Sequence, residues 1–210
     1  MTRSIRRIGA VLYSVYMEAN NATAARIYQS ALAILEAEGP QAVSLRRVAK
    51  EVGITPMAIY HHFPRRQALL DAVVDSEFAQ LADFFDRSSR NASVEAAIIH
   101  SMDGYIDYAL THPRIFDYVF SMPRPGARRF PKDFRARRSP TLNPTADLVS
   151  SWMKSGKLRR DDVWEIALEL WAHAQGYLAL WRAGRFSLTE DEFRKLVHRS
   201  FRRLLHGLAR

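Results

Sequence analysis

The side chains best suited to chemistry in this chain lie between positions 46 and 66, and they combine hydroxyl, phenol, imidazole and guanidinium groups with apolar ones. Such a set makes hydrogen bonds to phosphate oxygens and both polar and apolar contacts to base edges, so it suits the binding of duplex DNA. The candidates on one short predicted helix are Thr55, Met57, Ala58, Tyr60 and His61, and they are flanked by the basic residues Arg46, Arg65 and Arg66.

Two short helices joined by a tight turn would hold these groups. Ser44 is a good N-cap for the first helix, and Gly53 ends it because glycine adopts positive φ without strain. Thr55 followed by Pro56 is typical of a helix start, since proline at the first helical position loses no hydrogen bond. We expect this second helix to end near His62.

Small and apolar positions would let the two helices cross closely. Ala49 supplies a small side chain at the crossing, and Val48, Ile54 and Ile59 are expected inside the corner. An ordinary helical hairpin uses the same positions. The mixed polar exterior of the second helix favours instead a helix-turn-helix whose second helix reads DNA.

Residues 27–70 resemble the DNA-binding head of the tetracycline-repressor family of bacterial regulators. The likeness rests on Gly39 before the second helix, on residues 48–54, and on residues 59–70, where Tyr-x-x-Phe is followed by a basic residue and paired leucines. It implies an N-terminal head of three helices whose last helix contacts the major groove.

The resemblance also implies roles for single side chains. Ser44 matches a helix cap whose hydroxyl and amide reach a phosphate, and Tyr60 matches a tyrosine whose phenol donates to a phosphate. Arg66 stands where the family usually has lysine, at a helix start that favours an anion. The side chains implied to face bases are Thr55, Met57 and His61. Met57 departs from the small residue usual there, so it either touches a thymine methyl or restricts approach to the groove.

Apolar residues recur at spacings of three and four along the rest of the chain, which is typical of amphipathic helices. The sequence shows no convincing strand, internal repeat or glycine-rich phosphate loop, so we predict an all-α fold. We expect a flexible basic leader at 1–22, the helix-turn-helix head at 23–70, and a larger helical body for effector binding and dimerisation at 71–210. Asp161–Asp162 and a Thr189–Glu192 capping box are predicted to open the last two helices.

Two segments of the body resemble one branch of the same family: the proline-led residues 112–120 and a Trp…His-Gly helix at 171–176, here with a glutamine before the glycine. In that family the last two helices pack against their copies in a homodimer. The small residues Ala172, Gly176 and Ala179 would allow this close approach. The alternative is that they pack only within one chain.

The resemblance further implies a small-molecule effector inside the body, whose binding favours a state that cannot bind DNA. The candidate pocket residues are aromatic or methionine side chains at helical spacing: Phe85, Met102, Tyr105, Phe116, Phe120, Trp152, Trp171 and Tyr177. Such a pocket would take an apolar or aromatic ligand, with His100 or His173 as a polar anchor. Stripes of this kind are also typical of an ordinary core.

The formal net charge is +9, which favours polyanionic partners such as nucleic acid. The excess lies outside the predicted head, because residues 121–138 carry seven basic residues and one acidic residue. We interpret residues 121–144, which hold five prolines, as a solvated mobile loop. The alternatives are attraction of an acidic effector and nonspecific contact with the DNA backbone.

Other function classes find less support. The absence of cysteine excludes disulfides and thiolate metal sites and fits the reducing cytosol, and the histidines form no ligand triad, so no metal or cofactor is expected. The carboxylate pair considered for catalysis, Asp103 and Asp107, has a spacing typical of a solvated helix face. No apolar run approaches the ~20 residues that span a bilayer, so we expect a cytoplasmic protein without a membrane partner.

Together these patterns predict a ligand-responsive transcription regulator, with a repressor favoured, that binds a pseudo-palindromic DNA operator as a homodimer and is released by a small-molecule effector. A helical adaptor that binds another protein is the alternative. A substitution of Tyr60 by phenylalanine separates the two, because only a DNA binder would lose a phosphate contact.

Overall fold

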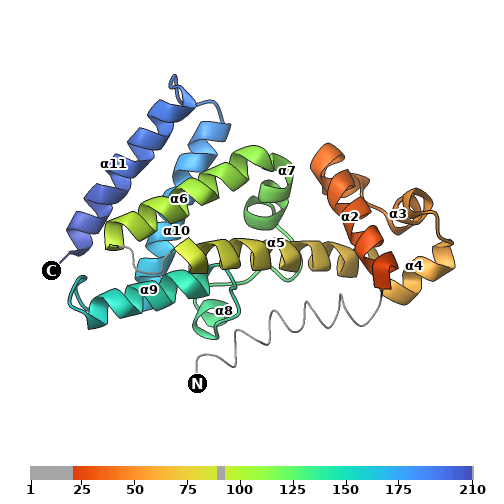
Figure 1. Ribbon diagram of the computed structural model, residues 1–210, viewed down its shortest axis with the longest axis horizontal. Helices are drawn as coiled ribbons and strands as arrows, with labels where there is room; N and C mark the ends of the chain where they lie inside the picture. Colours follow the sequence, from red (N-terminus) through yellow and green to blue (C-terminus); the bar gives the residue numbers. More distant parts are fainter. Residues whose placement is uncertain (1–20, 89–92, 210) are drawn as a thin grey trace. The chain divides into compact units, whose positions relative to one another are not determined.

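The computed structural model describes residues 21–88 and 93–209, and in these ranges every regular element is a helix (Figure 1). One isolated bridge pairs Leu158 with Ala209. The predicted all-α class, with an N-terminal helix-turn-helix head and a larger helical body, is confirmed. Residues 1–20 of the expected leader lie outside the described residues. Among the described residues, no helix combines the length and the apolar character that crossing a membrane requires.

The chain divides into two compact units. Unit 1 comprises Met1–Gln80 and His112–Pro125, and unit 2 comprises Leu81–Thr111 and Gly126–Arg210. By its contacts, the segment that follows Thr111 therefore groups with the head. The boundary between head and body that we place at residue 70 remains a prediction.

Unit 1 is organised around α2 (Asn21–Glu38). Its other elements are η1 (Pro40–Ala42), α3 (Leu45–Val52), α4 (Pro56–His62), the first part of α5 (Arg66–Ser88), α7 (Pro113–Phe116) and the π-helical turn η2 (Asp117–Ser121). The apolar core beneath α3 and α4 includes the fully buried Ile27, Leu35, Val48, Ile59 and Leu69. On another side of α2, Arg114 of α7 donates to the carbonyl of Glu36 at 3.0 Å.

The link between α2 and α3 begins at Gly39. Its φ of 87° and ψ of 173° lie in an extended region with positive φ that is essentially open only to glycine. Pro40–Ala42 then form the 3-10 turn η1, which the sequence does not predict. Val43, 1% exposed, anchors the link before α3 begins.

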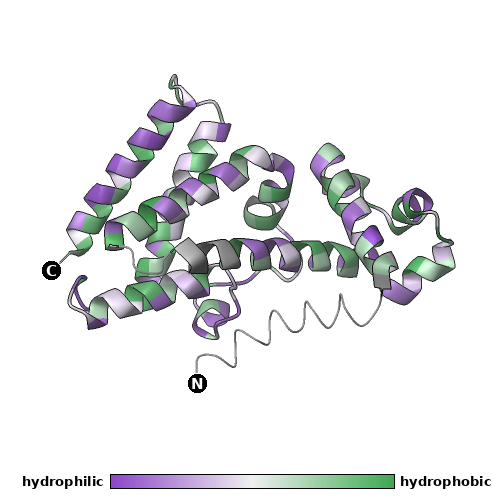
Figure 2. Cartoon of the chain, in the orientation of Figure 1, coloured by the Kyte–Doolittle hydropathy of each residue, from purple (hydrophilic) through white to green (hydrophobic). Residues whose placement is uncertain are grey.

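Unit 2 consists of α6 (Val94–Thr111), α8 (Lys132–Arg135), α9 (Leu142–Lys154), α10 (Val163–Arg182) and α11 (Glu190–Leu208). Both predicted helix starts are confirmed: Asp162 accepts from the Trp164 and Glu165 amides at 2.9 and 3.1 Å, and Thr189 and Glu192 form the capping box. Figure 2 shows hydrophilic and hydrophobic residues on different sides of α11. Its buried side comprises Phe193, Val197, Phe201 and Leu205.

The basic segment is more structured than the solvated loop predicted for 121–144. It contains α8, and α9 begins at Leu142. Phe134 of α8 is 6% exposed and packs with Leu142, Ala146 and Ala167, so one aromatic side chain fixes the segment to the core of unit 2. Three of its arginines pair with carboxylates: Arg135 with Asp162 at 2.7 Å, Arg137 with Asp147 at 2.8 Å and Arg138 with Asp133 at 3.2 Å.

Candidate nucleic-acid interface

The corner between α3 and α4 has the predicted local geometry. Ser44 accepts from the Arg47 amide at 3.2 Å and caps α3, while Gly53 ends that helix in the left-handed region with φ 73°. Thr55 accepts from the Ala58 amide at 3.1 Å, and Pro56 occupies the first turn of α4. These local hydrogen bonds fix the direction in which α4 leaves the turn.

Apolar packing holds α4 from its inner side. Ile59 is 0% exposed and Ala49, at the crossing of the two helices, is 1% exposed. Ile54, which we expected inside the corner, is half-buried. The close crossing therefore depends on Ala49 and on the buried Val48 more than on Ile54.

The outer side of α4 gathers three of the predicted DNA-contacting side chains. Met57 is 70% exposed, Tyr60 is 47% exposed and His61 is exposed. Positions three and four apart lie on one face of a helix, so these three side chains form a single surface, which we call the α4 face. Thr55 is exposed at the start of α4, whereas Ala58 is half-buried and contributes less surface.

Ser44 and Arg46 lie at the start of α3, and both are exposed. The Ser44 oxygen accepts a capping hydrogen bond, and its hydroxyl proton is still available to a phosphate. The α3 start thus offers an exposed hydroxyl and an exposed guanidinium close together in the sequence.

Arg66 is placed differently from the other candidates. Its guanidinium is half-buried and donates from Nε to the Val43 carbonyl at 2.7 Å and from Nη2 to the Pro40 carbonyl. Two of its five N–H groups therefore tie η1 to the start of α5. The predicted phosphate contact of Arg66 stays a prediction, and it would have to use the remaining donors.

A second arginine that positions the interface was not singled out from the sequence. Arg47 donates to Glu51 at 3.1 Å, on its own helix, and forms a two-pronged ion pair with Glu38 at the end of α2. Hydrogen bonds to Glu38, the larger cause, and to Glu51 raise the pKa of Arg47. The hydrogen bond between Arg47 and Glu38 also lowers the pKa of Glu38. The i, i+4 pair with Glu51 is visible in the sequence, but the pair with Glu38 depends on how the turn folds.

Sequence comparison assigns both parts of the chain to one family. Residues 27–73 match the family described as "Bacterial regulatory proteins, tetR family", and residues 98–209 match "Tetracyclin repressor-like, C-terminal domain". The chain belongs to the tetracycline-repressor family. Its α3–α4 corner is the DNA-binding helix-turn-helix of a transcription regulator, as the resemblance implied.

Individual relatives agree with this assignment. The HTH-type transcriptional regulator Mb1846 of Mycobacterium bovis is 23% identical over 130 residues, which are 59% of this chain and 54% of that protein. The nucleoid occlusion factor SlmA of Glaesserella parasuis is 26% identical over 78 residues, 37% of this chain and 39% of that protein. The chain therefore spans about half or less of the length of these curated relatives.

Solved structures resemble the whole chain more fully. A protein of unknown function from Rhodococcus sp. RHA1 is 26% identical, with a TM-score of 0.74 over 91% of this chain and 97% of that one. A putative tetR family transcription regulator from Shewanella sp. PV-4 is 17% identical, with a TM-score of 0.67 over 90% of this chain and 100% of that one. The second likeness concerns the fold alone.

The predicted effector residues of this family member fall in both units. In unit 2, the buried Tyr105 accepts from Trp171 Nε1 at 3.0 Å and donates to Gln175 Oε1 at 2.8 Å. Burial raises the pKa of the Tyr105 phenol, so it remains a neutral donor. Met102 is half-buried on the same helix as Tyr105. Trp152 is buried.

The remaining effector candidates lie outside the hydrogen-bonded group around Tyr105. Phe116 and Phe120 belong to unit 1 and contact each other with ring centroids 5.0 Å apart. Tyr177 packs on Phe186, with nearly parallel rings 6.3 Å apart. Phe85 lies in α5, and its side chain is outside the described residues. Direct contacts thus join Tyr105 with Trp171 in unit 2 and Phe116 with Phe120 in unit 1.

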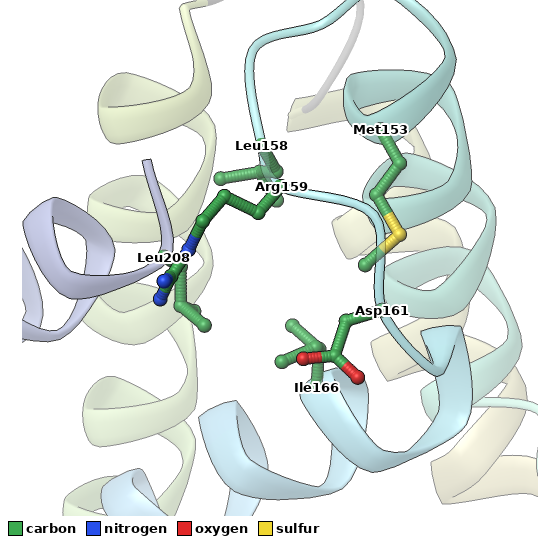
Figure 3. A pocket seen from close by; sticks show the side chains of 6 residues that line it. All are labelled: Met153, Leu158, Arg159, Asp161, Ile166 and Leu208. Atoms are coloured by element: carbon green, nitrogen blue, oxygen red, sulfur yellow. The ribbon is translucent and has the colours of Figure 1, made fainter. Parts of the chain in front are cut away.

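A small cavity in unit 2 involves none of the predicted effector residues (Figure 3). Its walls are Met153, Leu158, Arg159, Asp161, Ile166 and Leu208. The Arg159 side chain donates to the Gly207 carbonyl. The backbone amide of Arg159 donates to the Leu208 carbonyl at 3.1 Å. The space inside it is about 10 Å³, barely enough for one water molecule, so this cavity is too small for an effector.

The carboxylate pair considered for catalysis is engaged in ion pairs between α6 and α11. Asp103 lies 2.7 Å from His198 Nε2, and Asp107 lies 2.5 Å from Arg194 Nη2. Further along the same two helices, Glu95 pairs with Arg202 at 2.7 Å. These contacts give Asp103 and Asp107 a structural role in holding the two helices together.

Proposed function

We propose that this family member is a ligand-responsive repressor that binds a pseudo-palindromic operator as a homodimer and leaves it when a small apolar or aromatic molecule binds the body. The observation that carries the proposal is the α4 face. Its three side chains are exposed on a helix whose ends are capped and whose inner side is buried. Such a helix can enter the major groove without unfolding any part of the core.

The side chains around the α4 face divide into two kinds of contact. Met57 and His61, with Thr55 at the helix start, are placed to meet base edges and would supply sequence preference. The Tyr60 phenol, the Ser44 hydroxyl and the Arg46 guanidinium would contact phosphates and set the register of the head on the duplex.

The exposed side of α10 supports the homodimer. Ala172, Gly176 and Ala179 are all exposed and occupy one side of this helix, so the alternative that they pack within the chain is disfavoured. A Cβ atom at Gly176 would meet nothing within 4 Å, so the fold of one chain does not require glycine there. Close approach of a second copy would explain it. Leu180, 50% exposed beside them, would be covered in the same contact.

The effector part of the proposal rests on the polar group inside the body. Tyr105, Trp171 and Gln175 form a hydrogen-bonded set on α6 and α10 among aromatic neighbours. A ligand that inserts here would exchange these bonds for its own and shift the population toward a state that cannot bind DNA. A regulator of genomic DNA in a bacterium works in the cytoplasm, which is where we place it.

The test is a binding titration of the full chain with the DNA upstream of its own gene, at several salt concentrations. We expect a sequence preference over scrambled duplex and a log K that falls by about 0.9 per phosphate contact with log salt. Tyr60→Phe should weaken binding to all sequences alike. Lack of any sequence preference at every salt concentration would contradict the proposal.

A further inference from the structure

One side chain of the α4 face has only apolar chemistry. Met57 is 70% exposed, more than the other exposed large hydrophobic residues among those described. A single exposed apolar residue is ordinary on a protein surface. Met57 differs because it lies on the face that the proposed function puts against base edges.

The structure holds Met57 at a fixed point on that face. The Thr55 hydroxyl caps the helix two residues before it, and Ile59, two residues after it, is fully buried on the opposite side. Tyr60 and His61 follow at three and four residues and flank Met57 on the surface. Met57 therefore shares one helix face with a phenol and an imidazole, and it lies near the N-terminal end of α4.

The chemistry of methionine limits what this position can recognise. A thioether has no donor and is only a weak acceptor, so it cannot read the hydrogen-bonding pattern of a base pair. In the major groove the one apolar group is the C5 methyl of thymine. Cytosine has a hydrogen at that carbon, whereas 5-methylcytosine carries the same methyl as thymine.

We propose that Met57 is a specificity-determining residue that reads the C5 methyl group of one pyrimidine in each operator half-site, and that it accepts thymine or 5-methylcytosine there. The proposal rests on the proposed function, since it requires the α4 face to lie in the major groove. It makes operator binding sensitive to cytosine methylation at that position.

The experiment begins with the full chain and an operator selected from a random duplex library. Each thymine of the operator is then replaced by deoxyuridine, which removes the methyl and keeps every hydrogen-bonding group. Loss of one buried methyl-sized contact corresponds to about fourfold in affinity, and two half-sites together to about fifteenfold. We expect this loss at one position per half-site. With cytosine at that position, 5-methylation should raise affinity by about fourfold.

Variants at two exposed methionines test whether Met57 causes the affinity difference between thymine and deoxyuridine operators. Met57→Ala should bind thymine and deoxyuridine operators alike, and Met57→Leu should retain the difference. Met122→Ala, at another exposed methionine, is the matched control and should behave as the native chain does. Thermal unfolding of all three variants verifies that the exposed substitutions leave the fold intact.

Three outcomes would count against the proposal in distinguishable ways. Specific operator binding with no effect of deoxyuridine at any position overturns methyl reading and leaves the DNA-binding function standing. An unchanged thymine preference in Met57→Ala assigns the reading to another side chain, such as the Thr55 methyl, and also overturns the proposal. Failure to select any sequence contradicts the proposed function itself.

Discussion

At the scale of single residues, arginines of the head have two different roles: some stabilise the fold and others face solvent. Arg66 is half-buried and bonded to the carbonyls of Val43 and Pro40, whereas Arg46 is exposed on α3. A sequence shows both only as basic residues near a predicted DNA-binding helix. Their substitution should therefore have different consequences.

Arg66→Ala should lower the free energy of unfolding by about 2 kcal/mol, because two partly buried carbonyls lose a charged donor, and DNA affinity should fall with it. Arg46→Ala should leave unfolding unchanged and reduce the slope of log K against log salt by about 2, because each of the two subunits loses one phosphate contact. Chemical denaturation and salt-dependent titration measure the two effects. Equal loss of stability in both variants would refute the distinction.

His173 provides a pH prediction. Burial lowers the pKa of this imidazole, whose Nε2 lies 2.8 Å from Ser200 Oγ. The folded chain then binds a proton less readily than the unfolded chain, so stability falls as the pH drops through the ordinary value of 6.5 toward the lowered one. The melting temperature of the native chain should decrease more than that of His173→Gln between neutral pH and about pH 5.5. Parallel curves would show that His173 does not contribute.

Residues whose role is local could be predicted from the sequence, and residues whose role depends on tertiary contact could not. Ser44, Gly53 and Thr55 act within four residues of themselves, and the structure has each of them as expected. The bonds of Arg66 join residues 23 and 26 positions apart, so no local pattern indicates them.

At the scale of elements, helix starts are fixed by short capping motifs. Thr189 accepts from the Glu192 amide at 3.3 Å, and Glu192 accepts from the Thr189 amide at 2.8 Å. Hydrogen bonds from the Thr189 backbone and side chain lower the pKa of Glu192, consistent with a carboxylate that accepts at the helix start. This motif is readable in the sequence because all of its groups lie within four residues.

Thr189→Ala should reduce stability by about 1 kcal/mol through loss of the cap on α11. Urea denaturation followed by circular dichroism measures this change. Ser187→Ala, an exposed position just before the helix, is the matched control and should unfold like the native chain. An equal effect at both positions would mean that the cap is not the source of the stability.

The segment that contains α8 shows the limit of element prediction. Five prolines and seven basic residues between 121 and 144 are typical of a loop. The structure instead fixes the segment through Phe134, which packs against Leu142 and Ala167 of other helices. One aromatic residue in a basic run carries too little local signal to reveal such an anchor.

At the scale of the whole molecule, the sequence indicated the family and its two parts, a DNA-binding head and a helical body. Which body helices pack against each other could be seen only in the structure. The head motif spans only residues 27–73, yet the similarity to solved structures extends over about nine-tenths of the chain. The proposed homodimer is the feature that makes two heads available to one operator. It depends on the exposed side of α10.

Gly176→Leu should weaken the dimer without harming the fold. A Cβ atom there meets nothing within 4 Å in one chain, and leucine favours a helix over glycine by roughly 1 kcal/mol. The single chain should thus unfold no more easily, while analytical ultracentrifugation should show more monomer and operator affinity should fall. Ala96→Leu, an exposed position on α6, is the control. A Gly176→Leu chain that stays fully dimeric would contradict this interface.

The most direct test of the account is to locate α4 on DNA. The chain has no cysteine, so a single introduced cysteine can carry a DNA-cleaving reagent at one known place. With the reagent at His61→Cys, we predict cleavage inside the operator at two symmetric positions about 34 Å, or one helical turn, apart. With the reagent at Lys157→Cys in the body, we predict none. Cleavage from position 157 and not from position 61, on an operator that both proteins bind, would contradict the claim that α4 reads the major groove.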